Sequence, residues 1–337
     1  MSLALTILRD KSLEDVGEAF RYLFYGPAGV GKSRMLATIP MYELMKGTDP
    51  EDIHVFVLDL DDGFITVLKS QFPKDWWRFF TVIPIAGGID DIRDAVNFIH
   101  KEVQDFIKEH NHRPYIAIDN MEHWYVLSQD GFIQEAYGVD RAQKTVDIIQ
   151  SRIAARKDPN AKADGFSITE DWQGIKALHR QYRDKLFGCG AHIVCTSISK
   201  NMLDPKNKFA LVGYQPGGEA EEREGYKFHF VSYMGVTTKT EQSDTFKLVS
   251  KTKAQHYFMI LLKDRTTSHD RVWADERITF EQFMKAIDEG VLRNQQKFEN
   301  DSTNLLDKVR KATQDSGVNI VDTEPEEENE DDGDSLI

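Results

Sequence analysis

Short apolar runs alternate along the first two thirds of the chain with stretches in which apolar residues recur at helical spacing. This alternation is typical of βαβ units and of a mostly parallel sheet with helices on both faces. The apolar runs predict strands at Arg21–Tyr25, His54–Leu60, Phe80–Ile85, Tyr115–Asp119 and His192–Ser197. Between the third and fourth strands, the apolar stripe from Ile92 to Ile107 predicts a helix that packs on the sheet.

The later part of the chain is patterned differently. Two further helical stretches flank a polar segment at 157–165. The span Ile198–Gly225 is polar and contains glycines, which predicts a long loop. Tyr226–Thr238 and Phe246–Lys251 have the composition of antiparallel strands, and the strongly apolar segment His256–Leu262 follows them.

Together these elements predict an α/β fold with a mostly parallel central sheet, antiparallel additions after residue 225 and a small C-terminal helical extension. The expected core spans residues 1–275. The helical extension spans 276–315, and Thr279 and Gln282 have capping-box spacing at its start. Residues 316–337 have the composition of a disordered acidic tail.

Composition and charge limit the classes of protein to which the chain can belong. The 337 residues include no apolar run of membrane-spanning length and no secretion signal at the N-terminus, and there are only two cysteines. We therefore expect a cytoplasmic protein without a disulfide framework or a membrane partner. The net charge is -14, but nine acidic residues and no basic ones lie between Asp322 and Asp334. The remainder of the chain is close to balanced, so its charge neither favours nor excludes nucleic-acid binding.

One segment carries a specific chemical signal, the pattern G-x-x-x-x-G-K-S. Its residues are Gly26, Pro27, Ala28, Gly29, Val30, Gly31, Lys32 and Ser33. The glycines let backbone N–H groups face phosphates, Lys32 places a positive charge on the β- and γ-phosphates, and the Ser33 hydroxyl ligates Mg²⁺. A predicted strand precedes the pattern and a predicted helix at Lys32–Ile39 follows it, ended by Pro40. The sequence therefore predicts a phosphate-binding loop for ATP and Mg²⁺.

A magnesium nucleotide site also needs carboxylates at the ends of neighbouring strands. Asp119 ends a predicted strand and is the expected magnesium residue. Hydrolysis further needs a group that orients or deprotonates the attacking water. Asp61 and Asp62, which follow another strand, are the leading candidates for this role, and Glu122 is the third.

The order of phosphate-binding loop, acidic strand end and Ile118–Asp119 strand resembles that of the RecA-like ATPases. More narrowly, the chain resembles compact ATPases of phages and prophages, some of which act in single-strand annealing and recombination. The resemblance implies a nucleotide-sensing polar residue on the strand His192–Ser197, where this chain offers Thr196 and Ser197 instead of the usual His or Gln. The usual catalytic Glu is also replaced, by Asp61.

Two further features follow from the same resemblance. Lys263 and Arg265 resemble a Lys-x-Arg element that, in many RecA-like oligomers, reaches the γ-phosphate bound by a neighbouring subunit. This implies a homo-oligomer. The resemblance also implies single-stranded DNA as a partner, bound by the span Ile198–Gly225, although that span mixes basic and acidic residues. The acidic tail, which ends in Leu336 and Ile337, is a candidate docking segment for a protein partner.

The resulting prediction is an ATP-hydrolysing RecA-like protein that acts with DNA in phage-type recombination, annealing or replication. Two alternatives stay open at this stage. One is a nucleotide-dependent assembly or switch protein with weak hydrolysis. The other is a P-loop kinase of a small molecule, whose lid would need arginines near the phosphates, provided by Arg152, by Arg156, or by Arg180 and Arg183.

Overall fold

The computed structural model describes residues 19–158, 171–203, 211–216, 227–241, 252–264, 271–274 and 277–289. The chain divides into two compact units, Met1–Asp288 and Glu289–Ile337. The sheet, its covering helices and the site discussed below all belong to the first unit. Predictions that concern the acidic tail fall outside the described residues.

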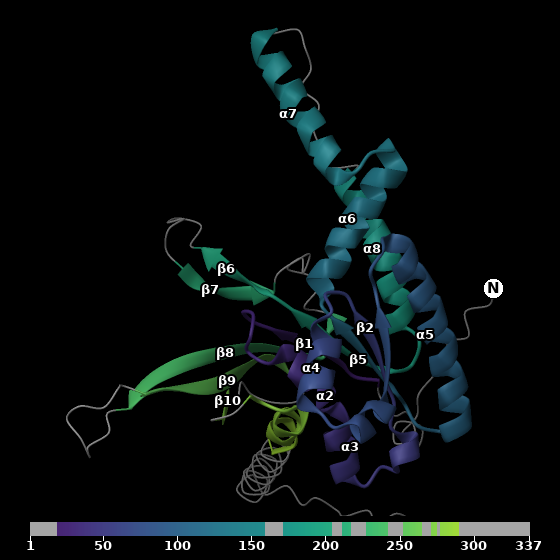
Figure 1. Ribbon diagram of the computed structural model, residues 1–337, viewed down its shortest axis with the longest axis vertical. Helices are drawn as coiled ribbons and strands as arrows, with labels where there is room; N and C mark the ends of the chain where they lie inside the picture. The colour runs from purple at the N-terminus through teal and green to yellow at the C-terminus, as the bar shows by residue number, and fades with distance from the viewer. Residues whose placement is uncertain are drawn as a thin grey trace, which may run out of the picture. The chain divides into compact units, whose positions relative to one another are not determined.

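A mixed eight-stranded sheet forms the centre of the first unit, with strand order β10-β9-β8-β1-β5-β4-β2-β3 (Figure 1). Its strands are β1 (Arg21–Tyr25), β2 (Val55–Asp59), β3 (Phe80–Pro84), β4 (Tyr115–Asp119), β5 (His192–Ser197), β8 (Phe230–Glu241), β9 (Thr252–Asp264) and β10 (Arg271–Ala274). The pairs from β8 through β1, β5, β4 and β2 to β3 are all parallel. β9 pairs antiparallel with β8, and β10 pairs antiparallel with β9.

The predicted fold class is confirmed: the fold is α/β, the central sheet is mostly parallel, and antiparallel pairing begins after residue 225. Strands β1, β4 and β5 have the bounds that their apolar runs predict, and β2 and β3 agree to within one residue at each end. One expectation needs correction. The strand after Tyr226 is antiparallel only toward β9, and its other edge extends the parallel sheet beside β1.

The helices are α2 (Lys32–Ala37), α3 (Ile39–Lys46), α4 (Gly63–Gln71), α5 (Ile89–His110), α6 (Met121–Tyr137), α7 (Arg141–Lys157), α8 (Asp171–Phe187) and a helix at residues 280–289, with short 3₁₀ turns η1 (Pro50–Asp52) and η2 (Lys74–Phe79). In Figure 1, α7 projects away from the sheet at the top of the view. In the described part of the chain, none of the helices combines the length and apolar character that a bilayer crossing requires.

Successive side chains of a strand point to opposite faces of the sheet, so the buried strands contribute to two hydrophobic layers, one on each face. On one face, Leu23 and Tyr25 of β1 join a core that includes the predicted α5 stripe, with Ile92, Val96 and Ile99 fully buried. On the other face, Tyr22 and Phe24 of the same strand make edge-on ring contacts with Phe283, at centroid separations of 5.9 and 4.9 Å. The helix at 280–289 therefore covers the face opposite α5.

The predicted capping box at the start of that helix is confirmed. The Thr279 backbone N–H donates to Gln282 Oε1 over 2.9 Å, and the Gln282 backbone N–H donates to Thr279 Oγ1 over 3.3 Å. A second contact fixes the same turn, because the backbone N–H of the buried Phe280 donates to Thr38 Oγ1 over 2.9 Å. The first turn of the helix is thus held both by its own cap and by the end of α2.

Two predicted segments differ from the structure. The helix after the phosphate-binding loop ends at Ala37, and Pro40 lies in the first turn of a new helix, α3, where its missing N–H costs nothing. The span Ile198–Gly225, predicted as a loop, contains a two-stranded antiparallel hairpin of β6 (Ser199–Leu203) and β7 (Leu211–Pro216). The predicted strand Phe246–Lys251 lies outside the described residues.

Candidate functional site

The glycine-rich loop lies between β1 and α2, at the carboxyl edge of the parallel strands. Gly29 and Gly31 have φ values of 81° and 101°, in the left-handed region that favours glycine. Gly26 is required for a different reason: a Cβ at this position would lie 2.2 Å from the carbonyl oxygen of Met234 on β8. The loop therefore uses its glycines both for backbone conformation and for close packing against a neighbouring strand.

Lys32 folds back over this loop. Its Nζ donates hydrogen bonds to the carbonyl oxygens of Gly26 and Pro27, each over 2.9 Å. Burial lowers the pKa of Lys32, and the charges of Asp119 and Asp61 oppose that shift. A cation held by two neutral carbonyl groups, with carboxylates facing it, is available to exchange those weak partners for an anionic ligand.

Asp119 ends β4 and is almost completely buried. Burial raises the pKa of Asp119 to about 6, while the Ser33 and Thr196 hydroxyls lower it and the neighbouring carboxylates raise it further. Thr196 Oγ1 donates to Oδ1 of Asp119. The other oxygen, Oδ2, is buried and has no hydrogen-bond partner among the described residues. A buried carboxylate oxygen without a partner is costly unless a ligand or cation completes its environment.

Three carboxylates meet at this edge of the sheet: ligand atoms of Asp59, Asp61 and Asp119 lie within 4.8 Å of one another. Asp59 is already engaged, because its two oxygens accept the backbone N–H groups of Phe64 and Ile65 over 3.3 and 2.8 Å at the start of α4. Asp59 therefore caps α4. The unpartnered oxygen of Asp119, with the Ser33 hydroxyl beside it, fits a hard divalent cation such as Mg²⁺, which prefers oxygen ligands.

Asp61 lies at the same edge but is exposed. Its Oδ2 accepts a 2.6 Å hydrogen bond from Asn120 Nδ2, and its Oδ1 accepts the backbone N–H of Gly63 over 3.1 Å. Asn120 uses its other amide atom to cap α6, since its Oδ1 accepts the backbone N–H of His123 over 3.0 Å. The carboxylate of Asp61 is thus fixed by two hydrogen bonds while it stays open to solvent.

These groups border a cavity of about 400 Å³. Its lining includes seven of the sixteen predicted site residues, namely Ala28, Gly29, Gly31, Lys32, Ser33, Asp61 and Asp119. Sequence reasoning did not identify Arg34, Asn120 and Arg277, which also line it. Of these, Asn120 directly follows Asp119 in the sequence and was the most accessible to prediction. Gly26, Pro27 and Val30 belong to the same loop and do not border the cavity.

Several other predicted residues lie away from the cavity. Asp62 is exposed, has φ of 56°, and its carbonyl oxygen accepts from the Thr66 hydroxyl over 2.8 Å. Glu122 lies in the first turn of α6 and does not line the cavity. Thr196 is buried against Asp119, and the carbonyl of the buried Ser197 accepts the Gly26 N–H over 3.3 Å. The apolar Ile198 is the residue of this strand end that borders the cavity.

The Lys-x-Arg element is described only in part. Lys263 lies in β9, where its backbone pairs with Val231 of β8. Arg265 lies outside the described residues. The predicted contact with a neighbouring subunit therefore stays a prediction.

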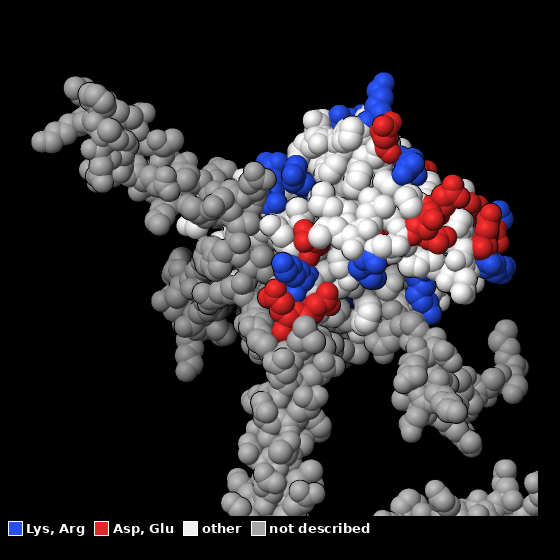
Figure 2. Space-filling model, turned by 90° about the horizontal axis from the view of Figure 1, so that it is seen from below, with Lys and Arg blue, Asp and Glu red and all other residues white. Residues whose placement is uncertain are grey.

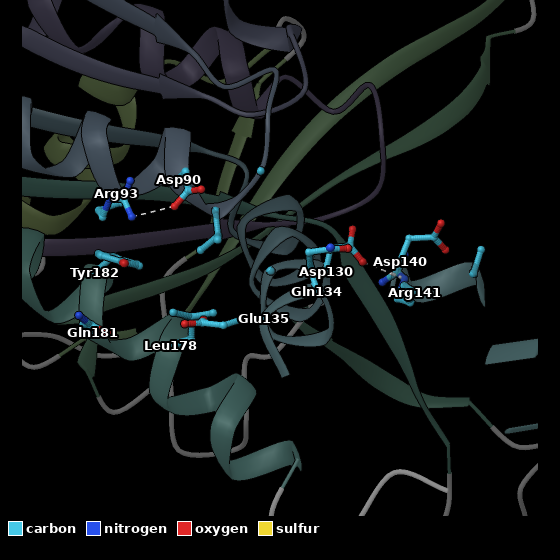
Figure 3. A pocket seen from close by; sticks show the side chains of 14 residues that line it. Asp90, Arg93, Asp130, Gln134, Glu135, Asp140, Arg141, Leu178, Gln181 and Tyr182 are labelled. Atoms are coloured by element: carbon cyan, nitrogen blue, oxygen red, sulfur yellow. Dashed lines mark ion pairs between the residues drawn. The ribbon is translucent and has the colours of Figure 1, made fainter. Parts of the chain in front are cut away.

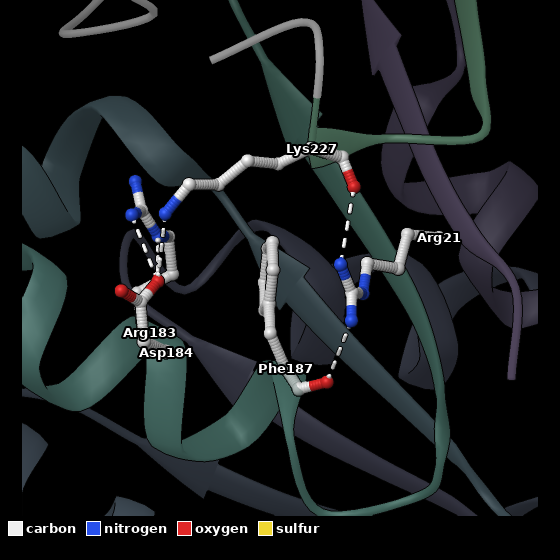
Figure 4. Close-up of polar contacts among 5 residues, drawn as sticks. All are labelled: Arg21, Arg183, Asp184, Phe187 and Lys227. Atoms are coloured by element: carbon white, nitrogen blue, oxygen red, sulfur yellow. Dashed lines mark hydrogen bonds and ion pairs between the residues drawn. The ribbon is translucent and has the colours of Figure 1, made fainter. Parts of the chain in front are cut away.

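The arginines considered for a kinase lid do not border the cavity. Arg183 is fully buried and pairs with Asp184, which also accepts Lys227 Nζ over 2.9 Å (Figure 4). Nearby, Arg21 donates to the carbonyl of Phe187 over 3.1 Å and stacks over its ring, tying β1 to the end of α8. Arg183 is therefore part of the structural framework around α8, which removes it from the lid.

A larger cavity of about 1010 Å³ lies between α5, α6, α7 and α8 (Figure 3). Both arginines of its lining are paired with acidic lining residues: Arg93 with Asp90 over 2.8 Å, and Arg141 with Asp130 over 3.1 Å. The surface shown in Figure 2 likewise has basic and acidic side chains next to one another among the described residues. Neither feature favours one class of ligand.

No protein-family model and no curated protein matches the chain. Among solved structures, the chain is similar to a prototypical ATPase from the type III secretion system of pathogenic bacteria, with a TM-score of 0.37 and 11% sequence identity over 64% of this chain. The match covers 52% of that ATPase, so the chain corresponds to about half of its length. The fold assignment therefore rests on this chain's own strand order and on the glycine-rich loop between β1 and α2.

Proposed function

We propose that the chain binds Mg-ATP in the cavity beside residues 26–33 and hydrolyses it. The observation that carries this proposal is the arrangement around Asp119. The Oδ2 atom of Asp119 is buried and has no partner among the described residues, and the carboxylate of Asp61 lies close to that of Asp119. The negative charges of Asp119 and Asp61 both act to raise the pKa of Lys32. A cation position and a phosphate-binding lysine thus meet at the end of one glycine-rich loop.

Each group then has a defined role. Lys32 exchanges its two carbonyl partners for phosphate oxygens. Ser33 and Asp119 are the residues that would hold magnesium, and the ion, when bound with the nucleotide, neutralises charge on the phosphates. Asp61 orients the attacking water and accepts its proton, because it is the acid that borders the cavity while open to solvent.

Binding is tested by titrating labelled ATP against the parent chain and Lys32→Ala, with magnesium and with a chelator. We expect the lysine variant to bind at least about 100-fold more weakly, because it loses a charge-assisted contact to two phosphates. Equal affinity in the two proteins, or no binding by the parent with magnesium present, contradicts the proposal.

A second candidate function has its own supporting observation. A nucleotide-dependent switch with weak hydrolysis is favoured by the strand end at Thr196–Ile198. Its two polar side chains are buried, and the residue that borders the cavity is apolar. Turnover measured at saturating Mg-ATP separates the two functions: slow turnover with tight binding favours the switch.

The DNA-linked role and the homo-oligomer stay predictions from the resemblance to phage-type RecA-like ATPases. They are tested together by measuring turnover per subunit with and without single-stranded DNA over a range of protein concentrations. Stimulation by DNA, with a salt-sensitive affinity, supports the DNA role. A rate that rises with protein concentration supports a site completed by a second copy.

A further inference from the structure

One cation of the cavity comes from a segment far from the glycine-rich loop in the sequence. Arg277 borders the cavity together with Lys32, Ser33 and Asp119. Its aliphatic carbons lie directly against Gly31: a Cβ built on that glycine would lie 3.2 Å from both Cβ and Cδ of Arg277 and 3.3 Å from Cγ. The residue before the phosphate-binding lysine is therefore packed against an arginine stem.

The backbone that carries Arg277 is held in place by its neighbours. Ile278 and Phe280 are buried, at 1% and 0% exposure, and the Phe280 N–H donates to Thr38 Oγ1 over 2.9 Å. Gly31 and Thr38 are the residues that flank α2 at its two ends. The segment 277–280 therefore runs alongside α2, and Arg277 lies at the end that faces the cavity.

Arg277 differs from the other cations of the cavity in its lack of a protein partner among the described residues. Lys32 donates to two carbonyl groups, and Arg34 donates to Gln71 Oε1 over 2.8 Å. Arg277 is half-buried, and no ion pair or hydrogen bond joins it to another described residue. A half-buried guanidinium without a protein partner has lost part of its hydration, and an anion bound in the neighbouring cavity would stabilise its charge.

We propose that Arg277 binds the phosphate chain of the nucleotide, in cis, from the segment that leads into the helix at 280–289. This inference rests on the proposed function and adds a residue that the glycine-rich pattern does not contain. A guanidinium matches phosphate oxygens with two parallel N–H donors, which a lysine at the same place does not reproduce.

The test uses the full chain, with Mg-ATP and inorganic tripolyphosphate as two separate ligands. Arg277→Ala removes the side chain, and Arg277→Gln keeps most of the stem against Gly31 while removing the charge. We expect both variants to bind each ligand about 10- to 100-fold more weakly than the parent, because a charged hydrogen-bond donor is lost. Arg277→Lys should fall between them and the parent. The matched control is Arg93→Ala, whose arginine is paired with Asp90 over 2.8 Å and does not border this cavity, and its affinity for both ligands should stay within about threefold of the parent's.

The outcomes separate this inference from the proposed function. If the parent binds ATP, Lys32→Ala does not, and Arg277→Gln binds as the parent does, the role of Arg277 is overturned and the nucleotide site stands. A loss for ATP without a loss for tripolyphosphate also overturns it, since Arg277 would then contact the base or ribose. If the parent binds neither ligand, both proposals fall. Circular dichroism melts of all five variants, Lys32→Ala included, establish that each one is folded.

Discussion

The side-chain amide of Asn120 donates a hydrogen bond to the carboxylate of Asp61 over 2.6 Å. The bond joins the ends of two adjacent parallel strands, because Asp59 of β2 is in register with Asp119 of β4. It holds the exposed carboxylate of Asp61 beside the cavity, whereas Asp119 is buried. Two acids at neighbouring strand ends thus have different environments, which suits different roles in one reaction.

The first prediction concerns this pair. Asp61→Asn should lower ATP turnover by about 100-fold or more while Mg-ATP affinity stays within about threefold, because a general base acts on the reaction more than on ground-state binding. Asn120→Ser keeps an oxygen that caps α6 but removes the amide that holds Asp61, so we expect a smaller loss of about tenfold. Steady-state turnover and equilibrium titration, measured on the same preparations, give the two quantities.

Asp62→Asn is the matched control for that experiment. Asp62 is the adjacent acid, it does not border the cavity, and asparagine tolerates its φ of 56°. Its turnover should equal that of the parent. If Asp62→Asn loses as much activity as Asp61→Asn, the assignment of the water-orienting acid is wrong.

The second prediction compares two glycines of the same loop. Gly26→Ala places a Cβ 2.2 Å from the Met234 carbonyl oxygen, so the loop or β8 must move. Gly29→Ala meets no atom within 4 Å, and its cost is limited to the strain of a positive φ, about 1 to 2 kcal/mol. Thermal unfolding should therefore show a clearly larger fall in Tm for Gly26→Ala. Equal melting temperatures would mean that the β8 contact does not constrain the loop.

Features that local sequence determines were predictable. β1, β4 and β5 are near-continuous apolar runs that end at the glycine-rich loop, at a carboxylate or at a polar segment, and their bounds follow directly. The loop itself was predictable because each of its positions has its own physical requirement. The hairpin of β6 and β7 was missed because residues 199–216 mix polar and apolar positions without the strict alternation that marks a strand with one buried face.

Features that depend on tertiary contact were not accessible in the same way. Asp59, Asp61 and Asp62 are chemically equivalent in the sequence, and only the start of α4 shows that Asp59 is a cap. Arg277 lies 246 positions after Gly31, and no spacing rule links two residues so far apart. The side chains that complete the site therefore become visible only once the sheet and the covering segments are in place.

The third prediction is that replacing Asp119 stabilises the nucleotide-free protein but weakens its response to the nucleotide. Burial raises the pKa of Asp119 from 3.8 to about 6. The unfolded chain therefore releases this proton at a lower pH than the folded chain does. Above about pH 6 the buried carboxylate is charged and lowers the free energy of unfolding. This loss of stability disappears as the pH falls toward 3.8. Asp119→Asn should raise the stability of the nucleotide-free protein at pH 7, by at most about 3 kcal/mol.

The same Asp119 variant should lose the extra stability that Mg-ATP is expected to confer on the parent, since it removes a proposed magnesium ligand. Thermal melts at pH 7 with and without Mg-ATP measure both effects. A variant that melts below the parent in the absence of nucleotide would show that the hydrogen bond from Thr196 outweighs the burial of charge.

The fourth prediction concerns acid sensitivity of the helical layer. His179 of α8 is buried with its ring edge-on to Trp124 and Tyr125 of α6. Burial, followed by the charges of Arg183 and Arg180, lowers the pKa of His179 to about 3. An unfolded histidine takes up a proton near its ordinary pKa of 6.5 and the folded one does not, so His179 contributes a loss of stability as the pH falls from 6.5 toward 3.

The size of this loss is about 1.4 kcal/mol at pH 5.5 for such a histidine. His179→Gln should lower stability at pH 7.5, through lost packing, and yet lose less stability than the parent between pH 7.5 and 5.5. Denaturant unfolding at both pH values gives the difference, and comparing proteins at each pH cancels the opposite trend of Asp119. His123→Gln changes an exposed histidine of α6 and should keep the parent's slope. If it flattens the slope as much as His179→Gln does, burial of His179 is not the source of the acid sensitivity.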